Sequence, residues 1–311
     1  MISVKVLLST YNGETYLAQM LDSLFAQVGV NVSLLVRDDG SKDRTRAILD
    51  KYAQVHAITV LKGENIGWRD SFMTLLKAIP EDDASDYYAF ADQDDIYFEN
   101  KLQSATTLLA DFADTPTLYH SNVIMADDAG KPLGDRYLRS FVPTVRLPQA
   151  YFDVTWLGTT MVFNRKMMAL IRQHVPVKSI IHDAYVINLA QFFGKIVYDP
   201  TPHMLYRRHG GSVTGFGASD TAQKIKEPSL LDRYRRYKKT PISNPFSRRA
   251  HEILQGYNSK LSEPQRRFLV ALDIYRTDLK SRLYLLLAPS VRASKLRPTL
   301  QIKYRVLTNT L

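Results

Sequence analysis

The sequence contains no cysteine, which excludes a disulfide framework, a metal site built from thiolates and a cysteine nucleophile. It also lacks any run near the roughly 18 consecutive apolar residues that a membrane-spanning helix needs. The chain opens directly on a strand-like stretch at residues 4–9, without the flanking pattern of a signal peptide. We therefore expect a cytoplasmic protein that neither spans a membrane nor is exported.

Glycine is scarce at the position where many nucleotide-binding folds need it. The loop after the first strand-like stretch holds one glycine, Gly13, and no G-x-G-x-x-G pattern follows that stretch. Such a pattern lets the backbone approach a dinucleotide closely, so its absence disfavours a dehydrogenase. A nucleotidyltransferase normally opens with a glycine-rich phosphate loop, and it is disfavoured for the same reason.

Acidic residues are scarce in the last third of the chain. Residues 1–215 carry 21 Lys or Arg and 24 Asp or Glu, whereas residues 216–311 carry 20 and 7, so the net charge of +10 comes from the second part. A basic segment of this kind suggests a polyanionic neighbour such as nucleic acid or an anionic membrane surface. Hydrophobic residues make up 45% of the sequence, which excludes a disordered chain.

Short β-branched runs alternate with amphipathic segments in the first hundred residues. This order predicts an α/β fold with a parallel sheet covered by helices. The predicted strands are residues 3–9, 32–37, 57–61, 87–91 and 118–125, and a helix is predicted from about Phe98 to Leu109. From Leu230 onward the sequence has a helical and basic pattern, interrupted by prolines. Gly, Ser and Thr cluster in residues 215–228, so we predict domains at 1–215 and 216–311.

Polar residues follow each of the first four predicted strands, and three carboxylates follow the fourth. In open α/β sheets the ligand site lies at the carboxyl ends of the strands. Asp92, Asp94 and Asp95 lie within four residues, where like charges raise one another's pKa unless a cation intervenes. Oxygen ligands suit Mg²⁺ or Mn²⁺. A solvated turn with Asp95 capping the next helix is the alternative interpretation.

Other strand ends and one helix start carry further candidates, each with a structural alternative. Asp39 could accept a hydrogen bond from a pyrimidine or a ribose, or belong only to a turn with Ser41 as N-cap. Tyr11 could stack on a base or simply pack. Asp183, where a helical pattern starts, is either an N-cap or a general base supported by the positive helix end. His209 is either a metal ligand or a structural histidine.

Seven ordered segments carry a resemblance to a known family: STYNG, VRDDGSKDRT, KGENIG, FADQDDIYFENKL, WLGTTMVFNRK, IHDAY and YRRHGGSVTG. Together they resemble family 2 glycosyltransferases with the GT-A fold, a Rossmann-like nucleotide-binding sheet flanked by helices. The resemblance covers residues 1–215, with a nucleotide-sugar half at about 1–125 and an acceptor half at about 126–215. Within the family, DQDDIY and YRxH look most like bacterial rhamnosyltransferases of cell-surface polysaccharides.

The resemblance implies a role for individual residues. Asp183 matches the catalytic base, and Asp94, His209 and Asp92 match a Mn²⁺ or Mg²⁺ site in which Asp92 also faces the ribose. The nucleoside diphosphate sugar would be held by these matched residues: Ser9, Tyr11, Asp39, Lys62, Asn65, Asp92, Arg207 and Arg208. Trp156, Gly158 and Thr159 are expected beside the acceptor. The chemistry implied is an inverting, metal-dependent transfer of a sugar.

The expected donor is dTDP-rhamnose and the expected acceptor a saccharide or a lipid-linked saccharide, with a UDP-hexose transferase as the alternative. Residues 230–311 could dock on an anionic membrane, which would place the enzyme on the inner face of the cell membrane. They could also pack on the catalytic body or mediate homo-oligomers. No nucleic acid is expected as a partner, although Tyr and Arg interleave there, so a nucleic-acid-binding protein is a second alternative.

Overall fold

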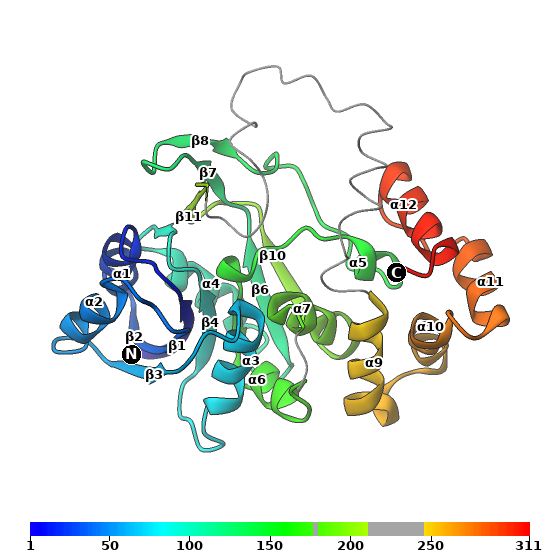
Figure 1. The fold of residues 1–311 in the computed structure, drawn as a ribbon, viewed down its shortest axis with the longest axis horizontal. Coiled ribbons are helices and arrows are strands. Elements are labelled where there is room, and N and C mark those ends of the chain that lie inside the picture. The colour runs from blue at the N-terminus through cyan, green and yellow to red at the C-terminus, as the bar shows by residue number, and fades with distance from the viewer. Residues whose placement is uncertain (177–179, 211–245) are drawn as a thin grey trace.

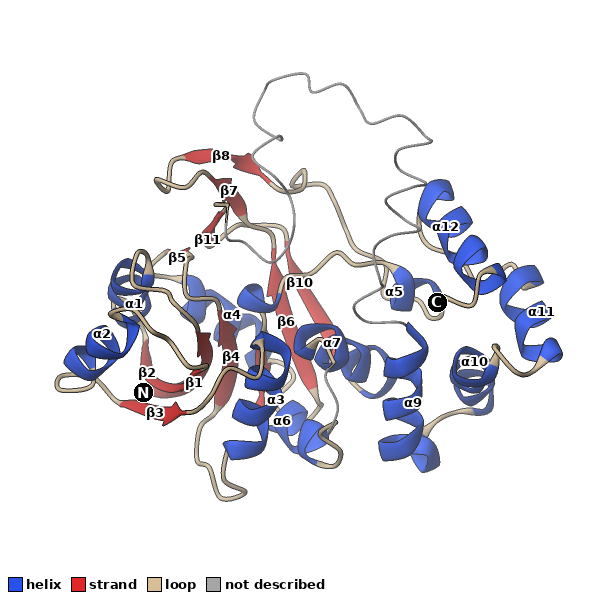
Figure 2. Cartoon of the chain, viewed as in Figure 1, coloured by secondary structure: helices blue, strands red, loops and turns tan. Residues whose placement is uncertain are grey.

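The computed structural model describes residues 1–176, 180–210 and 246–311. Its centre is a seven-stranded sheet in the order β10-β6-β9-β4-β1-β2-β3, with helices on both sides (Figures 1 and 2). The strands are β1 (Ile2–Thr10), β2 (Val30–Asp38), β3 (Ile58–Lys62), β4 (Tyr87–Ala91), β6 (Thr117–Ser121), β9 (Val162–Asn164) and β10 (Lys195–Asp199). The predicted α/β fold is confirmed.

Most neighbours in the sheet run parallel. β1 pairs in parallel with both β2 and β4, β2 with β3, and β10 with β6, whereas β9 lies antiparallel between β4 and β6. The sequence pattern predicted the parallel strands of the first half but not β9 or β10. Because β1, β2 and β4 are adjacent and parallel, the loops that follow them emerge at the same edge of the sheet.

The helices that cover the sheet include the amphipathic segments between the predicted strands and the helix predicted from about Phe98 to Leu109, which the structure begins at Lys101 and ends at Ala110. Their apolar residues recur at helical spacing and face the sheet, as in Leu17, Met20, Leu21 and Leu24 of the first helix. Asn164 caps its helix by accepting a hydrogen bond from the Met167 amide at 2.9 Å. The helices are α1 (Leu17–Phe25), α2 (Thr45–Tyr52), α3 (Trp68–Ala78), α4 (Lys101–Ala110), α5 (Gln149–Phe152), η1 (Gly158–Thr160), α6 (Arg165–Arg172) and α7 (His182–Phe193).

A second, four-stranded sheet lies beyond the carboxyl end of β4. Its order is β5-β11-β7-β8, formed by β5 (Ile96–Tyr97), β11 (Met204–Arg207), β7 (Ile124–Ala126) and β8 (Pro132–Asp135). The predicted single strand at 118–125 is therefore wrong: it is broken into β6 in the large sheet and β7 in the small one. The small sheet brings β11 against β5, directly after the acidic loop that follows β4.

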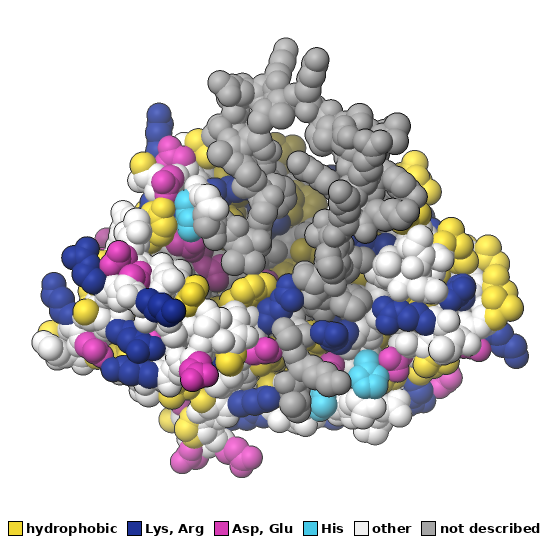
Figure 3. Space-filling view, in the orientation of Figure 1, with side chains coloured by type: hydrophobic (Ala, Val, Ile, Leu, Met, Phe, Trp, Pro, Cys, Tyr) yellow, Lys and Arg dark blue, Asp and Glu magenta, His cyan; other side chains and the backbone are white. Residues whose placement is uncertain are grey.

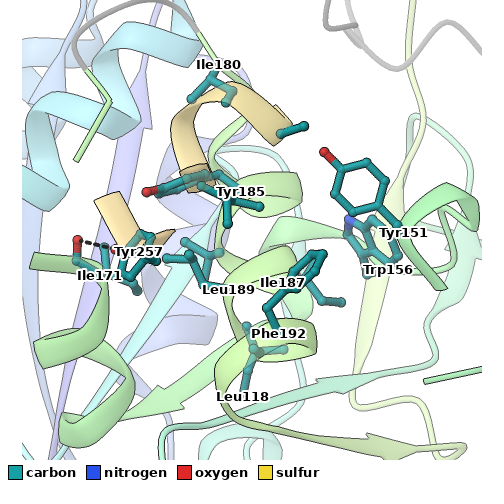
Figure 4. Close-up of a cluster of buried hydrophobic side chains, with 14 of the residues drawn as sticks. Leu118, Tyr151, Trp156, Ile171, Ile180, Tyr185, Ile187, Leu189, Phe192 and Tyr257 are labelled. Carbon is teal, nitrogen blue, oxygen red and sulfur yellow. Dashed lines mark hydrogen bonds between the residues drawn. The ribbon is translucent and has the colours of Figure 1, made fainter. Parts of the chain in front are cut away.

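The large sheet separates two apolar cores because successive strand residues point to opposite faces. Leu7 and Phe90 join α3, α6 and α7 on one face, whereas Leu8 and Ala89 join α1 and α4 on the other. The first core continues through Tyr151 and Tyr185 to Tyr257 of the C-terminal region, and Figure 4 shows these side chains packed together.

The C-terminal region is helical, as predicted. Its helices are α9 (Phe246–Tyr257), η3 (Asn258–Lys260), α10 (Glu263–Ile274), α11 (Leu279–Leu287) and α12 (Leu296–Leu307). Pro264 and Pro298 lie in the first turns of α10 and α12, so they begin helices instead of interrupting them. The Tyr257 hydroxyl donates to the Leu170 carbonyl oxygen at 2.9 Å, which joins this region to α6. The predicted domain boundary at 215–228 lies outside the described residues.

Within the described ranges, no helix has both the length and the apolar character needed to cross a bilayer.

Candidate active site at the carboxyl ends of the strands

The loop after β4 places three carboxylates in different surroundings. His209 Nε2 lies 2.7 Å from Asp94 Oδ2, and both side chains are mostly but not fully buried. Asp95 is buried, and its Oδ1 accepts a hydrogen bond from the Arg207 amide at 3.1 Å. Its Oδ2 is also buried and has no hydrogen-bond partner among the residues that the structure describes. The predicted convergence of Asp94 with His209 is therefore present in the fold.

The carboxylates of this acidic loop raise one another's pKa. Burial, together with the charges of Asp94 and Asp183, raises the pKa of Asp92 to about 8. Burial and the charges of Asp94 and Asp92 raise the pKa of Asp95 well above its usual value. A cation at this loop would relieve both effects, because each carboxylate is destabilised by desolvation and by its like-charged neighbours.

Whether a divalent cation fits at this loop depends on which groups would complete its coordination shell. Among residues 1–176, 180–210 and 246–311, no three His, Asp or Glu side chains are grouped to hold a metal by themselves. Mg²⁺ is usually bound through one or two carboxylates plus substrate phosphates, not by a cage made only of protein groups. The hard oxygen atoms of Asp94 and the imidazole of His209 fit that kind of partial site.

Arg207 fixes the acidic loop in place. Its Nε donates to the Asp94 carbonyl oxygen at 2.8 Å, its Nη2 donates to Gln19 Oε1 at 2.5 Å, and its Nη1 donates to the Asp128 carbonyl oxygen. The guanidinium also lies over the Tyr16 ring, 4.8 Å from its centroid. All three nitrogens of Arg207 thus bind protein groups, and its predicted contact with a diphosphate stays a prediction.

Arg208 is partly buried, and its amide donates to the Ala126 carbonyl oxygen at 3.0 Å. Its predicted role toward a diphosphate stays a prediction. His209, one residue further on, has its ring centroid 4.7 Å from that of Tyr16. The end of β11 therefore supplies Arg207, which holds the acidic loop by a hydrogen bond, and the segment just after it supplies the His209 imidazole that faces Asp94.

The loop after β1 is tied to the acidic loop. Gln93 Oε1 accepts from the Tyr11 amide at 3.0 Å, and Gln93 Nε2 donates to the Tyr11 carbonyl oxygen at 3.1 Å. The Tyr11 side chain itself is exposed, as stacking on a base would require. The Ser9 hydroxyl donates to Ser71 Oγ at 2.7 Å. Sequence reasoning missed Gln93, which its place between the two aspartates could have indicated.

Asp39, in the loop after β2, is buried and accepts hydrogen bonds from several donors. Asp39 forms an ion pair with Arg37, and its oxygens accept from the Ile66 amide at 2.9 Å and the Gly67 amide at 2.8 Å. Asn65 lies in the same turn, where its Oδ1 accepts from the Gly67 amide at 3.2 Å. Contact of Asp39 and Asn65 with a nucleoside stays a prediction.

Lys62 lies at the end of β3, and its Nζ is 3.4 Å from Asp50 Oδ1 in an exposed ion pair. The side chain of Lys62 therefore joins α2, whereas its backbone pairs with Asp38, the neighbour of Asp39. Its contact with the donor stays a prediction.

Asp183 lies in the first turn of α7, but Ile181 is the N-cap, so the N-cap interpretation of Asp183 is wrong. Its Oδ1 accepts from the Ala184 amide at 2.6 Å. Burial raises the pKa of Asp183, while the amides of Ala184 and Gly158 and the charge of Arg249 oppose that rise. The Asp183 residue as a whole is half-buried.

The three residues expected beside the acceptor differ in their placement. Gly158 packs directly against Asp183, because a Cβ added there would lie 3.3 Å from Asp183 Oδ2. Thr159 is buried, and its hydroxyl lies 3.0 Å from that of Tyr97. Trp156 is buried in the apolar core. Of these three, Gly158 is the residue for which the structure gives a close approach to Asp183.

Comparison with known proteins identifies the family. The model of the family described as glycosyl transferase family 2 matches residues 5–174, which is more than half of the chain. The chain belongs to this family. It is therefore a glycosyltransferase with a fold that binds nucleotide sugars, as the motifs had indicated.

Two curated relatives are similar to this chain over most of its length. The "dTDP-rhamnosyl transferase RfbG" of Shigella flexneri is 25% identical over 296 residues, covering 90% of this chain and 98% of the relative. The "Putative glycosyltransferase EpsH" of Bacillus subtilis is 26% identical over 258 residues, covering 75% of this chain and 72% of the relative.

Solved structures establish the GT-A fold. S. aureus TarS 1-349 in complex with UDP-GlcNAc has a TM-score of 0.58 and 18% identity, covering 99% of this chain and 80% of that structure. The mannosyltransferase PcManGT from Pyrobaculum calidifontis, in complex with GDP-Man and Mn2+, has a TM-score of 0.51 and 17% identity, covering 98% of this chain and 74% of that structure. At such identities the likeness concerns the fold alone.

Proposed function

We propose that this glycosyltransferase moves a sugar from a nucleoside diphosphate to an acceptor hydroxyl by an inverting displacement that needs a divalent cation. The observation that carries the proposal is the convergence of Asp183 with the acidic loop after β4. Gly158 packs against Asp183, and the hydroxyl of the next residue, Thr159, lies 3.0 Å from that of Tyr97, two positions after the acidic loop. Carboxylates more than 80 positions apart in the sequence thus lie near one site, and the charges of Asp94 and Asp183 both contribute to the raised pKa of Asp92. Such a concentration of negative charge is costly without a cation.

In the proposed mechanism, Asp183 accepts the proton of the acceptor hydroxyl as its oxygen attacks the anomeric carbon from the face opposite the diphosphate. The attack forms the new glycosidic bond as the bond to the diphosphate breaks, and configuration inverts once. Asp94 and His209 would hold Mg²⁺ or Mn²⁺, which neutralises charge on the departing diphosphate. No carboxylic acid is then needed to protonate the leaving group.

The protein's own groups set up this reaction. Arg207 holds the acidic loop by its carbonyl oxygen, so Asp94 keeps a fixed position. Gln93 joins this loop to Tyr11, whose exposed ring is available to stack on the donor base. Asp92 is placed to face the ribose or a water bound to the cation.

For the donor we propose dTDP-rhamnose. The support is the relative named as a dTDP-rhamnosyl transferase, which aligns over 98% of its own length. A UDP-hexose is the alternative, because the TarS structures of the same fold contain UDP-GlcNAc or UDP. Pocket shape decides between such sugars.

The experiment is a transfer assay with dTDP-rhamnose, UDP-glucose, UDP-galactose and UDP-GlcNAc, each with Mn²⁺, with Mg²⁺ and with a chelator. We expect product with dTDP-rhamnose and a cation only. Asp183→Asn should still bind donor and cation but lose at least about 10³-fold in kcat, because general-base catalysis contributes 10²–10⁴-fold. Undiminished transfer by this variant would remove Asp183 from the mechanism, and undiminished transfer in chelator would remove the cation.

We propose that the acceptor is a lipid-linked saccharide and that α11 and α12 dock the enzyme on an anionic membrane. Each helix buries one side against the core, through Leu285 on α11 and through Ile302 and Val306 on α12. The other side of each helix exposes a second apolar row at helical spacing: Leu279, Leu283 and Leu287 on α11, and Leu296, Leu300, Tyr304 and Leu307 on α12. These leucines include side chains with 74% and 76% exposure, at Leu287 and Leu296.

The charge around these rows favours an anionic surface as the partner. Residues 275–311 contain eight Lys or Arg and one Asp or Glu. In Figure 3, yellow apolar and dark blue basic side chains lie together along the right-hand edge, over α11 and α12. Apolar side chains beside basic ones suit the interface of an anionic bilayer, where leucines enter the acyl boundary and cations meet phosphates.

Flotation of the full chain with phosphatidylglycerol or phosphatidylcholine vesicles tests this docking. We expect binding to the anionic vesicles only, and at least tenfold weaker partitioning of the double variant Leu287→Gln, Leu300→Gln. Val55→Gln is the matched control, since Val55 is 76% exposed and follows α2, a helix that lies at the opposite end of the molecule from α11 and α12 in Figure 1. If the double variant instead turns a dimer into a monomer and floats normally, the apolar rows form an interface between two copies.

A further inference from the structure

We infer that Tyr97 is a positioning residue for the proposed reaction: its buried hydroxyl ties the turn that packs against Asp183 to the acidic loop after β4, and so fixes where the base lies relative to that loop. The inference rests on the proposed function, because it assigns Tyr97 a role only through Asp183 and the acidic loop. Sequence reasoning missed Tyr97, although it lies in the segment FADQDDIYFENKL.

The backbone of Tyr97 is fixed next to the acidic loop. Tyr97 lies in β5, directly after that loop, and pairs with Met204 of β11, the strand that ends in Arg207. Its amide donates to Ser23 Oγ of α1 at 3.1 Å. Because β5 is held from both β11 and α1, the Tyr97 side chain extends from a fixed point at the end of the acidic loop.

The hydroxyl of Tyr97 reaches the turn beside the proposed base. Its oxygen lies 3.0 Å from the hydroxyl oxygen of Thr159, and it also donates to the Phe90 carbonyl oxygen of β4 at 3.5 Å. Tyr97 and Thr159 are both buried, so water does not compete for these hydroxyls. A buried hydroxyl is costly unless it is hydrogen-bonded, and each of the two therefore holds the other in place.

The turn that carries Thr159 is η1, and its preceding residue is in contact with the proposed base. A Cβ added to Gly158 would lie 3.2 Å from Asp183 Cβ and 3.3 Å from Asp183 Oδ2. The turn is closed by the Met161 amide, which donates to the Gly158 carbonyl oxygen at 2.8 Å. A displacement of Thr159 would therefore also move Gly158, and with it the surface against which Asp183 packs.

A buried ammonium group fixes the ring of Tyr97. Lys101 is fully buried, and its Nζ lies 4.1 Å from the centroid of the Tyr97 ring. This Nζ has no hydrogen-bond partner among the residues that the structure describes. Attraction between an ammonium group and an aromatic face is strongest when both are desolvated. Rotation of the ring would weaken this contact, so Lys101 keeps the Tyr97 hydroxyl directed at Thr159.

The activity test removes only hydroxyl groups. Tyr97→Phe and Thr159→Val nearly keep the shape of each side chain but abolish the contact between them. We expect each to lower kcat about tenfold, because misplacing reacting groups by about 1 Å can cost about 10²-fold. KM for the donor should change less than twofold, since the groups that would touch the donor are kept.

Tyr257→Phe is the matched control. Tyr257 is also fully buried, and its hydroxyl donates to the Leu170 carbonyl oxygen at 2.9 Å, in the core between α6 and α9. This variant should lose a comparable hydrogen bond and some thermal stability, but its kcat per folded molecule should stay normal.

A double-mutant cycle measures the contact itself. If the two hydroxyls act through each other, Tyr97→Phe, Thr159→Val together should lower kcat no more than either alone, and the loss of Tm should be smaller than the sum of the single losses. The Tm measurement does not require an active enzyme. Should Tyr97→Phe fail to fold, the kcat and Tm of Thr159→Val decide the matter by themselves.

Two results would overturn the inference: additive losses of kcat in the cycle, or a normal kcat in Thr159→Val, which would leave the contact with a purely structural role. Calorimetry with dTDP and Mn²⁺ adds a second readout, in which Tyr97→Phe should bind within twofold of the unchanged protein. An active Asp183→Asn protein would instead overturn the proposed base, so failure of the inference and failure of the proposed function are distinguishable.

Discussion

The acidic ends of β2 and β4 lie on either side of β1 in the large sheet, and their carboxylates have different partners. After β2, Asp38 and Asp39 are buried and supplied with donors: Arg46 Nε is 2.5 Å from Asp38 Oδ2, the Ser41 amide donates to the same oxygen at 3.2 Å, and Arg37 pairs with Asp39. After β4, Asp94 faces only the imidazole of His209, and one oxygen of Asp95 has no hydrogen-bond partner among the described residues.

The difference separates carboxylates that the protein supplies with positively charged partners from carboxylates that it supplies with fewer. After β2, Arg37 and Arg46 pair with Asp39 and Asp38, and contact of Asp39 with a nucleoside stays a prediction. After β4, burial and like-charged neighbours raise the pKa of Asp92. Position at a strand end is therefore not sufficient to mark an aspartate that needs a cation, because its other partners matter as well.

The largest effect should come from Asp94→Asn. We expect transfer to fall at least about 10³-fold, because the site loses the charged oxygen that would bind the cation. The melting temperature should stay the same or rise, since the substitution relieves repulsion with Asp92 and Asp95. Calorimetry with Mn²⁺ and donor checks the binding, and a variant that binds both normally would contradict the assignment of Asp94.

The matched substitution after β2, Asp38→Asn, should instead lower stability and leave transfer nearly unchanged. Asp38 is fully buried and accepts from Arg46 and the Ser41 amide, so loss of its charge should lower the free energy of unfolding by about 1–3 kcal/mol. Transfer per folded molecule should stay within about twofold. Urea unfolding measures the first quantity. A stable but inactive Asp38→Asn protein would show that the two ends do not differ as described.

Measuring the free energy of unfolding as a function of pH should distinguish the two strand ends without an activity assay. Asp92 has a pKa of about 8 in the folded chain against 3.8 in its ordinary state. Between these values the folded protein keeps a proton that the unfolded chain has lost, so stability should fall as pH rises from about 4 to 8. Asp92→Asn should flatten this slope. A slope unchanged in Asp92→Asn would assign it to other groups.

The smallest effect should come from Asp50→Asn. Asp50 pairs with Lys62, and both side chains are more than half exposed, at 58% and 54%. Exposed pairs of this kind contribute little, so the free energy of unfolding should change by no more than about 0.5 kcal/mol. Urea unfolding measures this change, which can then be compared with the larger change expected for Asp38→Asn. A loss comparable to that of Asp38→Asn would mean that burial is not what distinguishes the carboxylates.

Local patterns in the sequence predicted much of the fold. Apolar periodicity located β1 to β4 and α1 to α4, because each of these elements buries its own repeating face against the sheet. The same patterns missed β9, which has three residues, and joined β6 to β7. Such short strands carry too few residues for a period to appear, and their pairing depends on neighbours far away in the chain.

The sequence by itself determined the parallel sheet, the basic C-terminal helices and the acidic residues that follow the strands. All of these features follow from the local order of residues and from composition. Only the tertiary structure decided which carboxylates are neutralised. His209 meets Asp94 across 115 positions, and the Arg207 amide meets Asp95 across 112. The reason is physical: the cost of a buried charge is set by the groups that surround it, and folding, not sequence proximity, brings those groups together.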